Sequence, residues 1–286
     1  MITYLGPLGA TFSERAYRLL SEKFDTPRID ADYANCIPAL KNGDIIPTII
    51  RHGGYGAIAM QTRAEGRVAE PLESYITLLE KHPSGAPISI LGALQMRISF
   101  ALMSRIGSDS HDATVIIGHG KSLGACKKNI ENWGIKTLEV SSNGLAAEMV
   151  ATDEQYARAL ALGPDSAAKK YGLTVIESAF EDMEAVTTFF LIGPKDKKVV
   201  VERENRALII FEINNRKGAL KAVIDILAEI NMIGIHSMHV ENGSYHFSVE
   251  VECSGSDIVA LENARRELEK FTNKCMFFGP FPVIQG

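Results

Sequence analysis

The 286-residue chain lacks several features that mark particular functional classes. Its four cysteines form no C-x-x-C pair and no His/Cys spacing typical of a metal site, so we expect reduced, mostly structural thiols and no bound zinc. The net charge of −5 gives no electrostatic reason to expect a nucleic-acid or anionic-membrane partner. No apolar run approaches the length of a membrane span, and no basic segment followed by an apolar stretch opens the chain. We therefore expect a cytoplasmic protein.

Cofactor fingerprints are also missing from the sequence. The glycine-rich stretch GPLGAT, from Gly6 to Thr11, lacks the lysine of a phosphate-binding P-loop and the glycine spacing of a dinucleotide-binding turn. The sequence therefore predicts that the protein needs neither a metal ion nor an organic cofactor.

The first segment that is present, YLGPLGATFSERAYRLL, reads as a strand, a tight corner and a helix. Thr11 followed three residues later by Glu14 predicts a capping box at the helix start. The remaining first-turn N–H groups would then point into the loop, where the helix dipole favours an anion. The corner is interpreted either as a cradle for an anionic substrate or as an ordinary strand-to-helix turn.

Charge and turn residues divide the chain into two units. A polar connector, GPKDKKVVVEREN, predicts a boundary near Lys197, which gives a unit of residues 1–196 and a unit of residues 197–286. In the first unit, strand-like runs alternate with helical patterns, which indicates α/β layering. One such run is Ile98–Met103, which we expect to be one strand. The second unit has the order β-α-β-β-α-β, typical of a ferredoxin-like sandwich.

The second unit resembles an ACT domain, a small-molecule regulatory module. The resemblance rests on the N-x-x-G-A-L motif, on INMIGIHS from Ile230 to Ser237, and on the closing G-P-F-P at Gly279 to Pro282. It implies a ligand cleft at a dimer interface, and hence a homodimer or homotetramer. The implied cleft residues are Asn215, Gly218, Ala219, Leu220, His236 and Ser237.

The first unit resembles the catalytic domain of prephenate dehydratases, so the resemblance covers essentially the whole chain. The family motif G-P-x-G-T-F-S-x-x-A is present with Ala10 as one extra residue, and two further matches are IIGHGKSLGAC and ALGPDSAAKKYGL. The family's fold has two α/β lobes around a cleft, like a periplasmic binding protein, followed by the ACT domain. The resemblance implies a lyase with prephenate as its substrate.

Carrying the family motifs over assigns two groups of site residues. The implied catalytic residues are Thr187, Ser142, Asn143 and Gln61. The implied substrate-binding residues are Thr11, Phe12, Ser13, Thr62, Arg63, Thr188 and Phe189. His119 is interpreted as a structural histidine in preference to a catalytic base.

This sequence departs from the family where the chemistry takes place. The family triplets Glu-Asn-Ser, Ser-Thr-Ala and Thr-Arg-Phe correspond here to 61–63 (QTR), 142–144 (SNG) and 187–189 (TTF). The arginine that could hold a carboxylate bidentately is replaced by Thr188, while Arg63 is a new cation. A relocated cation would turn the substrate, so that the proton reaches a ring carbon and the ring hydroxyl stays. That is the reaction of prephenate decarboxylases, a divergent branch of the family.

Three functions therefore remain open. The first is a non-aromatising prephenate decarboxylase, which gives a dihydro-hydroxyphenylpyruvate for specialised metabolism. The second is a prephenate dehydratase that makes phenylpyruvate for phenylalanine biosynthesis. The third is a ligand-binding sensor built on an inactive enzyme. Phenylalanine-sensing ACT domains carry Glu-Ser-Arg-Pro where this chain has 236–239 (HSMH), so we expect no feedback by phenylalanine.

Overall fold

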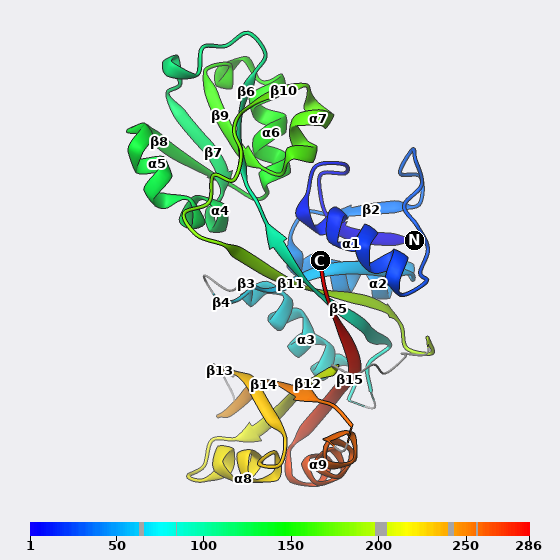
Figure 1. Ribbon diagram of the computed structural model, residues 1–286. Coiled ribbons are helices and arrows are strands. Elements are labelled where there is room, and N and C mark those ends of the chain that lie inside the picture. The colour runs from blue at the N-terminus through cyan, green and yellow to red at the C-terminus, as the bar shows by residue number, and fades with distance from the viewer. Residues whose placement is uncertain (63–65, 84, 198–204, 240–242, 256) are drawn as a thin grey trace.

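The computed structural model describes residues 1–62, 66–83, 85–197, 205–239, 243–255 and 257–286. Two α/β lobes lie at one end of the molecule and a smaller α/β unit lies at the other (Figure 1). The strands β5 and β11 run between the lobes. The predicted α/β class with two layered sheets is therefore confirmed.

Lobe 1 is formed by the N-terminal segments together with the strand that returns from lobe 2. Strand β1 pairs in parallel with β2 and β3, and β3 continues through antiparallel β11 to β5. The strands of lobe 1 are β1 (Ile2–Leu5), β2 (Cys36–Ala39), β3 (Tyr55–Thr62), β4 (Gly66–Arg67), β5 (Ile88–Ile98) and β11 (Ala185–Pro194). Its helices are α1 (Phe12–Lys23), η1 (Asn42–Asp44), α2 (Ile45–His52) and α3 (Ala69–Lys81).

Lobe 2 has its own sheet, in the order β10-β6-β9-β7-β8. Its strands are β6 (Ala101–Arg105), β7 (Val115–His119), β8 (Lys136–Val140), β9 (Ala159–Gly163) and β10 (Leu173–Glu177). Its helices are η2 (Ser110–Asp112), α4 (Gly120–Ala125), α5 (Lys127–Trp133), α6 (Asn143–Thr152), η3 (Glu154–Tyr156) and α7 (Asp165–Tyr171). The alanine-rich faces of α6 and α7 form a compact core with β6, β7 and β9.

The two chain segments that cross between the lobes are hydrogen-bonded to each other. The outgoing chain crosses at Ser99–Phe100, and the returning chain donates a hydrogen bond from Phe180 N to Phe100 O at 2.9 Å. Glu181 also accepts from Phe100 N at 2.9 Å. The prediction of one strand over Ile98–Met103 is wrong, because β5 and β6 belong to different sheets and the chain must break its ladder between them.

The C-terminal unit has the predicted β-α-β-β-α-β order. Its elements are β12 (Asn205–Asn214), α8 (Ala219–Ile226), β13 (Asn231–His239), β14 (Ser244–Cys253), α9 (Asp257–Phe271) and β15 (Lys274–Gln285). The strands lie in the order β13-β14-β12-β15, and α8 and α9 pack on one face of this sheet. The other face packs on α3 of lobe 1, for example through the edge-on contact of Tyr75 with Phe278.

Strand β15 joins this unit to lobe 1. Its first part pairs with β12, whereas Val283–Gln285 pair in parallel with Ala93–Gln95 of β5. Gln285 Nε2 also donates to Gln95 Oε1 at 2.8 Å. Figure 1 shows this strand rising from the C-terminal unit alongside β5. The larger sheet is therefore continuous from β13 to β2, and the boundary at residue 197 stays a prediction.

Candidate active site

A cavity of about 320 Å³ lies between the two lobes. The sequence-predicted residues on its surface are Thr11, Phe12, Ser13, Ser142, Asn143, Thr187 and Phe189. Lining residues that the sequence analysis did not select include Asn42, Glu70, Ile98, Phe100, Lys121 and Ser122. The structure thus brings together segments from the start, middle and end of residues 1–197.

Helix α1 begins at the cavity, and Thr11 fixes that beginning. Thr11 Oγ1 accepts a hydrogen bond from Glu14 N at 3.2 Å and donates one to Leu5 O at 2.9 Å. Its one hydroxyl proton is therefore already used, so Thr11 shapes the helix start and does not donate to a ligand. The donors left at this helix end are the N–H groups of Phe12 and Ser13, which have no acceptor within the helix. Among the described residues the Ser13 hydroxyl also has no hydrogen-bond partner.

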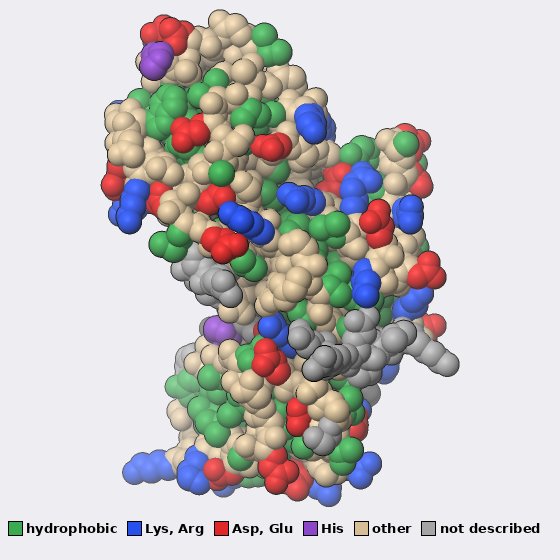
Figure 2. Space-filling model, viewed as in Figure 1, with side chains coloured by type: hydrophobic (Ala, Val, Ile, Leu, Met, Phe, Trp, Pro, Cys, Tyr) green, Lys and Arg blue, Asp and Glu red, His purple; other side chains and the backbone are tan. Residues whose placement is uncertain are grey.

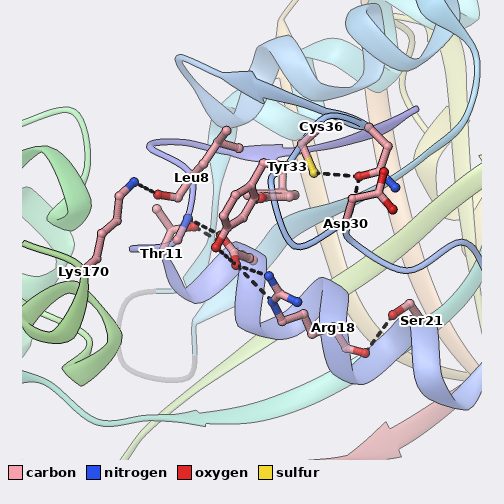
Figure 3. Close-up of polar contacts among 12 residues, drawn as sticks. Leu8, Thr11, Arg18, Ser21, Asp30, Tyr33, Cys36 and Lys170 are labelled. Carbon is pink, nitrogen blue, oxygen red and sulfur yellow. Dashed lines mark hydrogen bonds and ion pairs between the residues drawn. The ribbon is translucent and has the colours of Figure 1, made fainter.

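Glu14 does not complete the predicted capping box. Its buried carboxylate accepts from Gly9 N, from the hydroxyls of Tyr4 and Tyr33 at 3.1 Å each, and from Arg18 at 2.8 Å (Figure 3). Burial and the Glu14 charge both raise the pKa of the Tyr4 hydroxyl, so this group stays a proton donor. The carboxylate therefore anchors the glycine corner to the body of lobe 1.

The Gly-Pro corner contacts the opposite lobe, not the cavity. Ala10 is fully buried in the core of lobe 2, and Lys170 of α7 donates to Leu8 O across the gap between the lobes (Figure 3). A Cβ added at Gly144 would lie 2.6 Å from Pro7 Cδ and 3.0 Å from Ala10 O. The extra residue Ala10 and the glycine at 144 therefore fit each other. Residues 6–9 of the corner do not line the cavity, whereas the helix start beside them does, so the interpretation as a substrate cradle stays a prediction for the helix start alone.

Helix α6 also begins at the cavity. Ser142 Oγ accepts from Leu145 N at 3.1 Å, which caps the helix. Asn143 Oδ1 accepts from His119 N at 2.9 Å and from Ser122 Oγ at 2.6 Å, which ties the start of α6 to the start of α4. With its oxygen occupied, Asn143 has its Nδ2 amide hydrogens left as donors.

Neighbouring threonines of β11 face opposite sides of the sheet. Thr187 and Phe189 line the cavity, whereas Thr188 is buried on the side of Phe190, whose ring packs with α3 and the C-terminal unit. Thr187 has no hydrogen-bond partner among the described residues, so its hydroxyl is free for a ligand. The prediction that Thr188 binds substrate is wrong, because strand alternation turns it away from the cavity.

The remaining predicted residues of this site are at the end of β3. Gln61 pairs in register with Thr188 beyond a bulge, is half-buried, and does not line the cavity. Thr62 is in register with Thr187. Arg63 lies outside the described residues.

His119 caps α4, as expected for a structural histidine, but it also lines the cavity. Its Nδ1 accepts from Lys121 N at 3.3 Å, which places the proton of the neutral ring on Nε2. Burial is the main cause that lowers the pKa of His119, and the charge of Lys121 lowers it further, against the opposing charges of Glu139 and Glu70. At neutral pH the ring is therefore an uncharged hydrogen-bond donor.

Two charged groups at the cavity were missed from the sequence. Lys121 comes from α4 of lobe 2 and Glu70 from the first turn of α3 in lobe 1. Lys121 is part of the GHGKSLGAC segment, so its proximity to a matched motif was the available signal. No such signal marked Glu70, because this residue is outside the matched motifs and follows the changed triplet 61–63.

The C-terminal unit has a separate surface cavity of about 270 Å³. It brings together four of the predicted cleft residues, Asn215, Ala219, Leu220 and Ser237, with Arg216 and Tyr245. Gly218 precedes α8 in a left-handed conformation (φ 82°), which favours glycine. His236 does not line this cavity, because alternate residues of β13 face opposite sides of the sheet.

Two general features complete the description. Within the described ranges, no group of three or more His, Cys, Asp or Glu side chains is placed to hold a metal ion. The helices in those ranges are all too short or too polar to cross a membrane.

Comparison with known proteins gives consistent matches. A family model described as prephenate dehydratase matches residues 2–197. The prephenate dehydratase of Methanocaldococcus jannaschii is 27% identical over 289 residues, which covers 99% of this chain and 98% of that protein. That of Corynebacterium glutamicum is 25% identical over 301 residues, which covers 99% of this chain and 87% of that protein.

One solved structure provides the fold comparison. The prephenate dehydratase of Arthrobacter aurescens in complex with L-Phe has a TM-score of 0.81 at 21% identity, covering 98% of this chain and 89% of that one. At this identity the match shows the shared fold.

Proposed function

Because the chain belongs to the prephenate dehydratase family, we propose that it is a lyase that acts on prephenate in the cavity between the lobes. The observation that carries this proposal is the free hydroxyl of Thr187 in a cavity where two helices begin. Helix starts favour anions, and prephenate is a dicarboxylate.

The cavity walls suit the other parts of prephenate. Its ring has two apolar C=C edges, and the cavity offers Phe12, Phe100, Phe189 and Ile98 as apolar neighbours. The N–H groups of Phe12 and Ser13 supply hydrogen-bond donors for a carboxylate. Asn143 Nδ2 supplies donors from lobe 2.

The reaction needs one proton and releases carbon dioxide. The bond from the ring to its carboxylate breaks, and its electron pair moves into the ring. In dehydration, the pair expels the ring hydroxyl, which takes a proton and leaves as water; the ring becomes aromatic. Thr187, with its unpaired hydroxyl, is the residue that delivers this proton or orders the water that carries it.

Dehydration is the first candidate. The relatives named above are prephenate dehydratases, and the replacement of the family's arginine by Thr188 falls on the far side of the sheet from the cavity. Formation of phenylpyruvate is therefore compatible with the groups that face the substrate.

Decarboxylation without loss of the hydroxyl is the second candidate. It is favoured by the changed triplets, QTR at the end of β3 and SNG at the start of α6. In this reaction the electron pair takes up a proton at a ring carbon, so the product keeps its hydroxyl and stays non-aromatic. Such a product is expected for a role in specialised metabolism. An inactive sensor is the remaining alternative.

Incubation with prephenate distinguishes these outcomes. Phenylpyruvate has a strong enol absorbance in alkali and a mass lower by one water than the dihydro-hydroxyphenylpyruvate. Prephenate incubated alone under the same neutral conditions controls for its acid-catalysed breakdown. Unchanged prephenate after prolonged incubation with folded protein would refute the lyase. We also propose that turnover needs no metal or organic cofactor, so exhaustive chelation should leave it unchanged.

We further propose that the protein is a homodimer or homotetramer through its C-terminal units. The strand β13 is at the end of the larger sheet, with Ile233 and Ile235 37% and 44% exposed. Figure 2 shows hydrophobic side chains gathered on this side of the unit. A second β13 would extend the sheet and cover them. Light scattering that gives a monomer mass at micromolar concentration would contradict this.

The surface cavity of the C-terminal unit is proposed as the effector site implied by the ACT resemblance. The prediction that phenylalanine is not its effector can be tested by thermal shift and by kinetics with added phenylalanine. A saturable rise in melting temperature, or inhibition at millimolar phenylalanine, would contradict it.

A further inference from the structure

The charged side chains at the cavity between the lobes come from opposite lobes. Lys121 is the single Lys or Arg among the described residues that line this cavity, and Glu70 is the single carboxylate. His119 lines the same cavity, and the charges of both side chains act on its ring.

Lys121 has no ion-pair partner among the described residues. Its side chain is half-buried, so part of its hydration is lost without a compensating charge. Glu139, whose carboxylate lies beside Gly120, forms no ion pair with Lys121. A half-buried, unpaired cation at the wall of a cavity is suited to an anionic ligand.

Glu70 has a different environment. Its carboxylate is exposed and accepts a hydrogen bond from Gly43 N at 3.3 Å. A ligand carboxylate beside Glu70 would be repelled, whereas a ligand hydroxyl could donate to it. The lobe 1 wall near α3 therefore disfavours a carboxylate.

We propose that Lys121 binds one carboxylate of a dicarboxylate substrate and that Glu70 directs that carboxylate away from lobe 1, so that the two side chains set the orientation of the substrate. This inference rests on the proposed function. The second carboxylate is left for the start of α1, where the N–H groups of Phe12 and Ser13 are available. The ring hydroxyl is then left to face Glu70 or Thr187.

The first test compares Lys121→Gln with Lys127→Gln. Both changes remove one positive charge from lobe 2, but Lys127 is an exposed residue of α5 that does not line the cavity. Loss of a charge-assisted contact should raise the KM for prephenate roughly 10- to 100-fold in Lys121→Gln. Lys127→Gln should stay within about 2-fold of the wild type, and Lys121→Arg should retain most of the affinity because it keeps the charge.

The second test uses the opposite sign of Glu70. Glu70→Gln removes a repelling charge, so the KM of this variant for prephenate should stay unchanged or fall. If Glu70 instead made a binding contact with prephenate, the KM would rise. The salt dependence of KM should be steep in the wild type and nearly flat in Lys121→Gln, because added salt screens the contact that the variant lacks.

The outcomes separate this inference from the proposed function. A wild-type protein that leaves prephenate unchanged refutes the lyase itself. Turnover by the wild type together with equal KM values for Lys121→Gln and Lys127→Gln overturns the role of Lys121. A rise in KM for Glu70→Gln as large as that for Lys121→Gln overturns the orientation. Circular dichroism of each variant shows that the fold is intact, and Lys121→Met, which also removes the charge, carries the test if Lys121→Gln does not fold.

Discussion

Substitution of Gly144 by alanine should weaken the contact between the two lobes. The new Cβ would lie 2.6 Å from Pro7 Cδ, closer than Cβ atoms approach in folded proteins, and 3.0 Å from Ala10 O, which is tighter than most such contacts. The proline ring can move a little, but Ala10 is fully buried in the core of lobe 2 and its carbonyl belongs to the backbone. Overpacking of this kind costs about 1–3 kcal/mol.

A gain in helix propensity opposes this cost. Alanine is favoured over glycine by about 1 kcal/mol within a helix, and by less in a first turn such as this one. We therefore expect a net loss of about 1–2 kcal/mol in the free energy of unfolding, measured by urea unfolding. Gly43→Ala is the matched control, because its Cβ would meet Glu70 and Ser74 at ordinary contact distances of 3.4 to 3.5 Å.

A double-mutant cycle shows whether the clash is the cause. Pro7→Ala removes the ring atoms that the new Cβ would meet, so Gly144→Ala should cost less in that background, with a coupling energy of at least about 0.5 kcal/mol. The close contact with Pro7 and Ala10 does not explain the glycine at 144 if the free energy of unfolding of Gly144→Ala is within about 0.5 kcal/mol of the wild-type value. The same holds if the effects of the two substitutions are additive.

Three further predictions follow from the site and the sheet. Thr187→Ala should lower kcat, whereas Thr188→Ala should leave kcat unchanged, because only Thr187 faces the cavity; equal kcat losses in steady-state kinetics would contradict this. Because burial lowers the pKa of His119 below its unfolded value of about 6.5, its contribution to stability is complete above that pH and is lost as the pH falls toward the folded pKa. His119→Asn, which keeps a capping acceptor, should flatten the fall in urea midpoint below pH 6.5. Removal of residues 283–286 should cost about 2–4 kcal/mol in urea unfolding, from lost ladder hydrogen bonds and apolar burial, and an unchanged midpoint would show that the tail adds nothing.

Local patterns predicted the layered architecture well. Strand-like runs that alternate with helical patterns correctly indicated the α/β layering of the first unit. The order of strands and helices in the C-terminal unit was also predictable, because two segments with helical periodicity lie between its strand-like segments. The sequence did not show where the chain leaves one sheet for the other, since Ile98–Met103 is apolar throughout and the break depends on pairing with distant residues.

The candidate site was predicted in part, for a similar reason. Family motifs correctly pointed to Ser13, Asn143 and Thr187 as neighbours in space, although they are far apart in the chain. They did not reveal that Thr188 faces the other side of the sheet, because register is set by pairing with β5 and β3. Lys121 was overlooked, since a lysine near a glycine-rich turn is usually exposed to solvent.

The placement of β15 also has a consequence for synthesis of the chain on the ribosome. The part of the β5 edge that Val283–Gln285 occupy stays unfilled until these residues have been made, about 190 residues after β5 itself. Lobes 1 and 2 can therefore collapse while this stretch of backbone N–H and C=O groups is still unpaired. An unpaired edge on a nascent chain is a template for pairing with another chain. Ribosome-stalled chains from which residues 283–285 have not emerged should accordingly bind chaperones for longer than stalled chains from which these residues have emerged.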